Sequence, residues 1–204
     1  MALVPPATFT LLGSQQTSIA TSVIVNPGFE YSSGFVASVA GFKVVGDGRV
    51  VGGLGIWLPT EGDKMALVST GLGLTKASGS FAQSICLPPL PPGATKLTLS
   101  WDWNFFSEEF IEYCGSEFQD SFEVTFGATS LQHSQIDDLC PIVVHDDIAF
   151  DKGDVYTTGW LTQNIDVTQF AGSSGNVLKF AAKDVGDSVY DSAILVDNVR
   201  LVAE

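Results

Sequence analysis

The sequence has few basic residues and no long apolar run, and each shortage excludes a class of protein. Only nine of the 204 residues are Lys or Arg, against 23 Asp and Glu, so the net charge is −14. Such a chain repels nucleic-acid phosphates and anionic lipid head groups. No apolar run approaches the roughly 18 residues that a membrane-spanning helix needs. We therefore expect no nucleic-acid partner and no direct membrane insertion.

Cysteine and histidine are also scarce. The three cysteines form no CxxC pair and the two histidines stand apart from them, so zinc is not expected. Cys114 and Cys140 lie in polar, loop-like stretches, where a disulfide is plausible in an oxidising compartment. Cys86 lies in an apolar run and is expected to be a buried core thiol. The sequence does not fix the pairing, and one thiol is left over.

Helical periodicity is almost absent, and short runs rich in Val, Thr, Phe, Leu and Ile recur between turn residues instead. Apolar residues make up 45% of the chain and include 14 Phe, which is enough for a packed core. The pattern predicts an all-β, two-sheet antiparallel β-sandwich of jelly-roll type. The expected strands are 8–12, 18–25, 64–70, 80–87, 96–105, 121–126, 141–145, 158–167, 176–182 and 192–202. We expect a lead-in segment, 1–16, and one domain, 17–204, of unknown oligomeric state.

The strand expected at 96–105 has the clearest pattern. Its apolar residues Leu97, Leu99, Trp101, Trp103 and Phe105 alternate with polar ones. Such alternation predicts a half-buried strand, with one face on the core and the other in water.

Acidic residues gather in the second half of the chain, where residues 101–204 hold nineteen of the 23. Calcium binds six to eight oxygens, preferably from carboxylates and carbonyls on loops, so these acids are candidate ligands. The candidates in the two densest segments are Glu108, Glu109, Glu112, Asp120, Asp184, Asp187 and Asp191. The alternative is that such acids accept backbone N–H groups at turns and strand ends.

The two ends of the chain carry short motifs that look built to meet. NPGFE (26–30) leaves a strand through a Pro-Gly turn, and VDNVRL (196–201) places an acid in an apolar final strand. These motifs resemble those of the jelly-roll, galactose-binding-like carbohydrate-binding modules. In that family the corresponding acids help to hold a structural calcium ion, so the resemblance implies this role for Glu30 and Asp197.

A second resemblance covers about forty residues. The segments 105–124 and 182–201 are similar to two segments of the bacterial surface-protein domain named choice-of-anchor L. The sequence departs from that pattern in having Phe110 and Ile111 where Tyr-Pro is usual and Gln119 where Asn is usual. The resemblance implies a secreted or surface-anchored protein, whose export signal would lie outside this chain because residues 1–16 do not read as a signal peptide.

One aromatic residue is a candidate for ligand contact. Trp57 is flanked by glycines and followed by Glu61 and Asp63, so it is expected on a loop where it can stack on a sugar face or another partner group. The alternative is the usual one for tryptophan, a place in the core.

Catalysis has little support in the sequence. Glycosidases use a pair of carboxylates, and Glu109 could form such a pair with Glu112 or with Asp120. Acid pairs are common, however, and no other catalytic motif is present. We expect a calcium-binding, extracellular binding or adhesion module that recognises a glycan or a protein segment without catalysis. The alternatives are a structural spacer domain with calcium for stability only, and a glycoside hydrolase that uses acids in 108–120.

Overall fold

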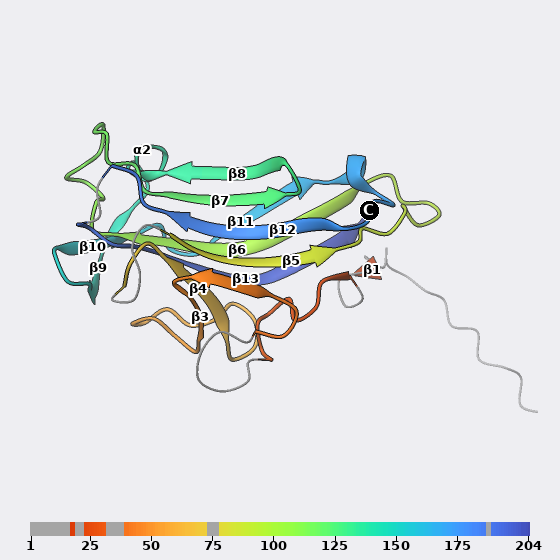
Figure 1. The fold of residues 1–204 in the computed structure, drawn as a ribbon, viewed down its shortest axis with the longest axis horizontal. Coiled ribbons are helices and arrows are strands. Elements are labelled where there is room, and N and C mark those ends of the chain that lie inside the picture. The colour runs from red at the N-terminus through yellow and green to blue at the C-terminus, as the bar shows by residue number, and fades with distance from the viewer. Residues whose placement is uncertain (1–16, 19–22, 32–38, 73–77, 187–188) are drawn as a thin grey trace, which may run out of the picture.

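The fold is a β-sandwich of two antiparallel sheets, as the sequence predicts (Figure 1). The computed structural model describes residues 17–18, 23–31, 39–72, 78–186 and 189–204. The larger sheet contains β1 (Thr17–Ser18), β3 (Gly48–Val51), β4 (Met65–Ser69), β6 (Leu97–Ser107), β9 (Val144–Ala149), β10 (Asp154–Thr157), β11 (Leu161–Asp166) and β13 (Ser192–Ala203). The smaller sheet contains β2 (Lys43–Gly46), β5 (Ser78–Ile85), β7 (Ser121–Phe126), β8 (Thr129–Gln135) and β12 (Asn176–Lys183).

In the larger sheet the main path runs β3-β4-β13-β6-β10-β9, with β1 beside β13 and β11 beside β6. In the smaller sheet the order is β2-β5-β12-β7-β8. Two short helices, α2 (Ile136–Leu139) and η1 (Thr168–Phe170), complete the described elements. No helix in the described ranges is long and apolar enough to cross a bilayer.

Eight of the expected strands have counterparts in the structure, namely β4, β5, β6, β7, β9, β11, β12 and β13. The expected strand 8–12 lies outside the described residues, as does the lead-in segment 1–16. The expected strand 18–25 is wrong over 23–25, which have no strand structure. Four strands were missed, namely β2, β3, β8 and β10. They are short or polar, so their periodicity is too weak to distinguish them from loops.

The central strand β6 differs from expectation in one respect. All of its eleven residues are buried, so its polar face is not in water. Asp102 on that face accepts hydrogen bonds from the hydroxyls of Thr60 and Thr162. The apolar and polar residues of β6 do alternate, as expected. The loop with Thr60 and the strand β11 with Thr162 supply the hydrogen bonds that water would otherwise make to the polar face.

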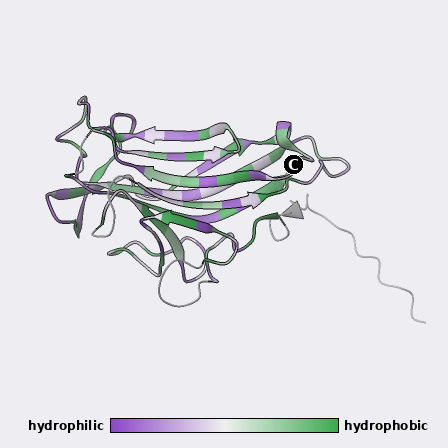
Figure 2. Cartoon of the chain, in the orientation of Figure 1, coloured by the Kyte–Doolittle hydropathy of each residue, from purple (hydrophilic) through white to green (hydrophobic). Residues whose placement is uncertain are grey.

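Two hydrophobic clusters lie on opposite faces of the larger sheet. The main core fills the space between the sheets, where Trp101 packs edge-on against Phe180 with ring centroids 5.9 Å apart. A smaller cluster holds Met65 and Leu67, whose neighbours along β4 belong to the main core, so it lies on the outer face. Trp57 packs against this outer cluster. In Figure 2 most of β4 has the apolar colour, because its residues alternate between the two clusters.

One core residue was misplaced by the sequence analysis. Cys86 was expected to be a buried thiol, but it is free and exposed. It directly follows β5, between the buried side chains of Ile85 and Leu87, so the alternation of the extended chain turns it outward.

Candidate binding and metal sites

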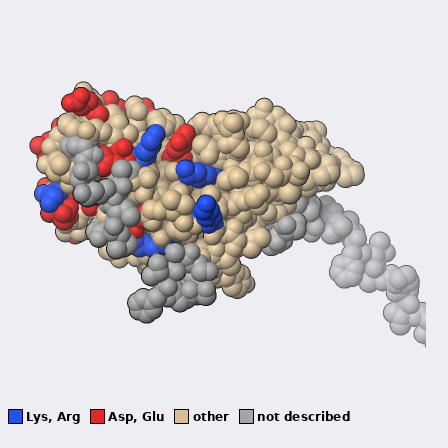
Figure 3. All heavy atoms as spheres, in the orientation of Figure 1, with Lys and Arg blue, Asp and Glu red and all other residues tan. Residues whose placement is uncertain are grey.

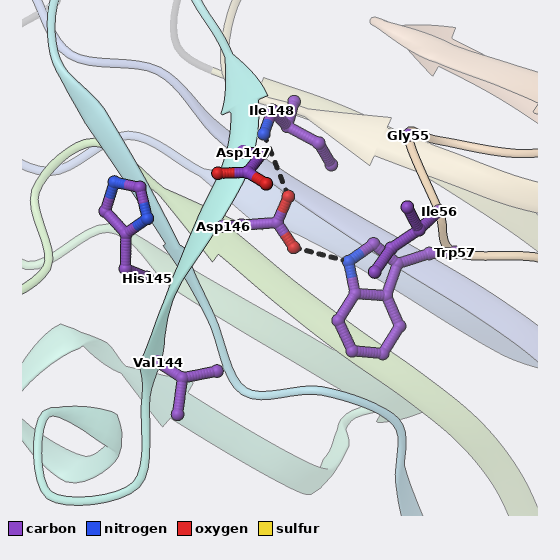
Figure 4. A pocket seen from close by; sticks show the side chains of 8 residues that line it. All are labelled: Gly55, Ile56, Trp57, Val144, His145, Asp146, Asp147 and Ile148. Carbon is purple, nitrogen blue, oxygen red and sulfur yellow. Dashed lines mark hydrogen bonds between the residues drawn. The ribbon is translucent and has the colours of Figure 1, made fainter.

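An open pocket next to β9 is formed around Trp57 (Figure 4). Its volume is about 440 Å³. The residues that line it are Gly55, Ile56, Trp57, Val144, His145, Asp146, Asp147 and Ile148. Ile56 and Val144 are 83% and 58% exposed, so the pocket opens to solvent between apolar side chains. This group is called the Trp57 pocket below.

Trp57 is held in place from two directions. Its turn is closed by reciprocal backbone hydrogen bonds with Leu54, each 3.0 Å long. Its indole Nε1 donates to Oδ2 of Asp146 at 2.6 Å, while its ring meets Phe106 edge-on at 6.0 Å. Asp146 is itself fixed, because its Oδ1 accepts the backbone N–H of Ile148 (Figure 4). The ring is therefore a rigid wall of the pocket.

The expected companions of Trp57 are not in its pocket. The structure places Glu61 and Asp63 on the next loop, where both are exposed. The polar groups of the pocket come instead from His145, Asp146 and Asp147 on β9. The sequence shows these three as a His-Asp-Asp run, but nothing local indicates that the run pairs with a tryptophan about ninety residues away.

The two end motifs meet, as expected. The backbone N–H of Val199 donates to the carbonyl of Pro27. A Cβ at Gly28 would lie 3.5 Å from Oε2 of Glu61 and 3.9 Å from Oδ1 of Asp197 and Cγ of Glu30. Carboxylate oxygens of Glu61 and Asp197 and the Cγ of Glu30 therefore lie around Gly28, and we call these three residues the Gly28 cluster.

Backbone amides occupy part of the Gly28 cluster. Oε1 of Glu30 accepts the N–H groups of Asp63 and Lys64 at 3.0 Å each. Oδ2 of Asp197 accepts those of Thr60 and Glu61. Each carboxylate thus anchors the 60–64 loop through one of its oxygens.

Asp197 is nonetheless costly to ionise. Burial raises its pKa to about 6, and its hydrogen bonds, the largest of them from the backbone of Glu61 and Asn198, offset this only in part. A cation beside this carboxylate would stabilise its charged form. Oδ1 of Asp197 already accepts the N–H of Asn198, whereas Oε2 of Glu30 and the carboxylate of Glu61 accept no hydrogen bond from the described residues. These are oxygens of the kind that calcium binds, although the three side chains are not arranged around one point.

The acidic segment after β6 is largely used for internal contacts. Buried Glu108 accepts the N–H groups of Lys152 and Gly153 through Oε1, and that of Asp191 through Oε2. Buried Glu109 accepts the N–H of Asp120. The alternative reading of these acids, as acceptors of backbone N–H groups, therefore describes both glutamates.

Glu112, in contrast to the two buried glutamates, is exposed. It lines a second, smaller pocket of about 230 Å³ together with Glu108, Phe110, Ile111, Lys152, Gly153, Asp154, Tyr156 and Tyr190. The structure thus does not bring Glu112 together with buried Asp120 in one cavity.

Asp120 and Asp191 lie next to the loop that follows β6, because their backbone N–H groups donate to Glu109 and Glu108. Asp120 is fully buried, its Oδ1 accepts the N–H of Val185, and its Oδ2 has no partner among the described residues. Burial, and to a lesser degree the charge of Asp184, raise its pKa to about 7. Burial and nearby acids, Asp151 first, raise that of Asp191 to about 6. Asp187 lies outside the described residues.

Across the described residues no group of three or more His, Cys, Asp or Glu side chains is arranged to hold a metal ion. Of the acids expected to bind calcium, Glu30 and Asp197 lie in the Gly28 cluster, Glu108, Glu109 and Asp120 make internal contacts, and Glu112 is exposed. Figure 3 shows acidic side chains gathered at the end of the sandwich that carries α2 and the β9–β10 hairpin.

A disulfide joins Cys114 to Cys140, the pairing that the sequence analysis favoured. It ties the loop that follows β6 to the C-terminal end of α2. Within that loop Ile111 has a positive φ of 74°, an uncommon conformation for a β-branched residue.

Comparisons with known proteins find similar shapes but no family. No protein-family model matches the chain, and no curated protein matches it significantly. The membership in the choice-of-anchor L family that two segments imply therefore stays a prediction.

The solved structures of similar shape include modules and an enzyme. The carbohydrate-binding module TmCBM61, in complex with beta-1,4-galactotriose, is 14% identical over 88% of this chain and 97% of that one, with a TM-score of 0.43. Module CBM27-1 of Caldicellulosiruptor saccharolyticus, in complex with mannohexaose, is 13% identical over 79% and 90%, with a TM-score of 0.46. A cyclase from Fischerella sp. TAU is 14% identical over 89% and 95%, with a TM-score of 0.43. At these values the likeness assigns neither a ligand nor a reaction to this chain.

Proposed function

We propose that the chain is a non-catalytic binding module that recognises a glycan at the Trp57 pocket. The observation that carries this proposal is the fixed indole of Trp57, which forms one wall of an open cavity beside the polar groups of His145 and Asp147. A sugar ring offers a face of C–H groups that packs on an indole, and its hydroxyls bond to carboxylates and imidazoles. The volume of the pocket lies in the range of about 300–1,000 Å³ that is usual for small-molecule sites.

The absence of catalysis is part of the proposal. Glu109 and Asp120, which were considered as a hydrolytic pair, are 1% and 0% exposed. A carboxylate at that depth does not reach a polysaccharide. Both groups hold backbone amides, which supports a structural role for them.

The proposal also includes calcium, held by the Gly28 cluster. Glu30 and Asp197 anchor the 60–64 loop, and exposed Glu61 is long enough to turn its carboxylate toward them. Calcium there would fix the loop and neutralise Glu30 and Asp197, the two acids for which the resemblance to calcium-containing modules implies this role. It would serve the stability of the fold and not the ligand, because Trp57 lies in a different pocket.

We place the module outside the cell or at its surface, in an adhesion or glycan-attachment role. The disulfide between Cys114 and Cys140 supports an oxidising environment. The segments that resemble choice-of-anchor L also imply a secreted or surface-anchored protein.

The test is a glycan array followed by titration calorimetry on the best ligands, with Trp57→Ala and Tyr31→Ala compared. Tyr31 is 74% exposed and outside both pockets, so Tyr31→Ala removes an aromatic ring without touching the site. We expect Trp57→Ala to weaken binding by about tenfold or more, as for a central aromatic contact, and Tyr31→Ala to leave it unchanged. A thermal scan of each variant shows that the fold is kept.

Three results would replace the proposal. Binding of extended peptides and of no glycan, lost in Trp57→Ala, would identify a protein segment as the ligand. Binding of neither class would favour the structural spacer. Turnover of a polysaccharide that is abolished by Glu112→Gln would establish a hydrolase.

A further inference from the structure

We infer that the Trp57 pocket selects glycans that carry protonated amino groups, such as oligomers of glucosamine, and that Asp147 sets this preference. The inference rests on the proposed glycan-binding function and names the class of sugar. It is drawn from the hydrogen-bonding state of the two carboxylates in the pocket and from the sign of the charge around it.

The two carboxylates of the pocket differ in what they are available to do. Asp146 is buried, and both of its oxygens are engaged, by the indole of Trp57 and the backbone N–H of Ile148. Asp147 is exposed and has no hydrogen bond or ion pair within the described part of the chain (Figure 4). It is therefore the anionic group that a ligand meets.

Within the described part of the chain, no Lys or Arg pairs with Asp147. The described residues that line the pocket include neither Lys nor Arg. On the neighbouring β9–β10 turn, the ammonium of Lys152 lies 3.1 Å from Oδ2 of Asp151, so its charge is already balanced. His145 faces another acid, with Nε2 4.0 Å from Oδ1 of Asp154.

The pocket is lined by residues of β9, a strand at the acidic end of the sandwich (Figures 1 and 3). A uronic or sialic acid would be repelled there, and a neutral sugar would gain hydrogen bonds from its hydroxyls but no ion pair. A protonated amine gains an ion pair with Asp147 and, over the indole of Trp57, a cation–π contact. The exposed apolar side chains of Ile56 and Val144 suit the C–H face of the same sugar.

The test compares three tetrasaccharides that differ in charge: a glucosamine oligomer, its N-acetylated form and an oligogalacturonate. Affinities are measured by calorimetry at low and at high salt for the unchanged protein, Asp147→Asn and Glu117→Gln. Glu117 is an exposed acid that lines neither pocket, so Glu117→Gln removes the same charge elsewhere.

We expect the glucosamine oligomer to bind most tightly and its N-acetylated form about threefold to fivefold more weakly, as one exposed ion pair allows. High salt and Asp147→Asn each remove that difference, and Glu117→Gln keeps it. Three results would overturn the inference: equal binding of the two forms, tighter binding of the acidic oligomer, or a preference that survives Asp147→Asn. None of these would contradict the proposed glycan site itself. Failure of every sugar on the array to bind would instead remove the proposed function.

Discussion

Buried carboxylates in this protein serve mainly as acceptors for backbone amides. Glu108 accepts three such bonds, from two segments that are 44 and 83 residues away along the chain. Glu109 and Asp197 anchor other loops in the same way. A carboxylate in this position stabilises a loop more strongly than a neutral acceptor, because its hydrogen bonds are charge-assisted.

Asp120 is costly to ionise in the folded state, and this gives a prediction for pH. Its pKa of about 7 is above the ordinary 3.8, so the folded state binds a proton that the unfolded state has released. The free energy of unfolding should therefore fall as the pH rises from about 5 to about 8, by on the order of 2 kcal/mol for Asp120 alone. Asp191 and Asp197 shift in the same direction. Urea unfolding at several pH values in chelator measures this.

The matched variant is Asp120→Asn, which keeps the acceptor for the N–H of Val185 and removes the titration. Its unfolding free energy should depend less on pH than that of the unchanged protein, whatever its absolute stability. A slope of opposite sign, or an equal slope in Asp120→Asn, would show that Asp120 is ionised in the fold without cost.

At the scale of elements, β6 organises the molecule. It pairs with β13, β10 and β11 and is buried on both faces. Beyond its end the chain enters the loop that holds Glu108 and Glu109, and the disulfide fastens this loop to α2. The loop lacks a regular element of its own, so the covalent link and the buried glutamates define its position.

The disulfide should therefore contribute measurably to stability. It closes a loop with a sequence separation of 26, for which loop-closure entropy gives about 3.5 kcal/mol. The double variant Cys114→Ser with Cys140→Ser should lower the denaturant midpoint, and a reductant should do the same to the unchanged protein. Cys86→Ser is the control, because Cys86 is exposed and unpaired. An unchanged midpoint in the double variant would mean that the glutamate contacts alone hold the loop.

At the scale of the whole molecule, charge and apolar surface are distributed differently. The acids gather at the end with α2 and the β9–β10 hairpin, while the apolar core extends through the whole sandwich (Figures 2 and 3). The Gly28 cluster joins the first described loop to the last strand, so a cation there would link distant parts of the chain.

Calcium binding at the Gly28 cluster should appear as a rise in thermal stability. At about a hundred times the dissociation constant, binding adds about 2.7 kcal/mol, which corresponds to roughly 5–10 °C for a chain of this size. Magnesium at equal ionic strength should have little effect. Glu30→Gln should abolish the shift and Asp120→Asn should retain it. A shift that persists in Glu30→Gln would move the site elsewhere, and no shift at all would leave the carboxylates as loop anchors only.

The sequence by itself determined the fold class, most of the strands and the meeting of the two ends. These follow from local patterns: a period of two, turn residues between runs, and an acid placed in an apolar final strand. It also marked Trp57 as a ligand candidate, but it joined Trp57 to Glu61 and Asp63, which are merely near in sequence.

Only the tertiary structure decided which groups are buried and what each acid bonds to. On the polar face of β6, Asp102 is bonded to Thr60 from a loop 42 residues away and to Thr162 on the neighbouring strand β11. Asp146 joins Trp57 from 89 residues away. Periodicity records which side of a strand a residue lies on, but whether that side meets water, an amide or an indole depends on segments that only the folded chain brings together.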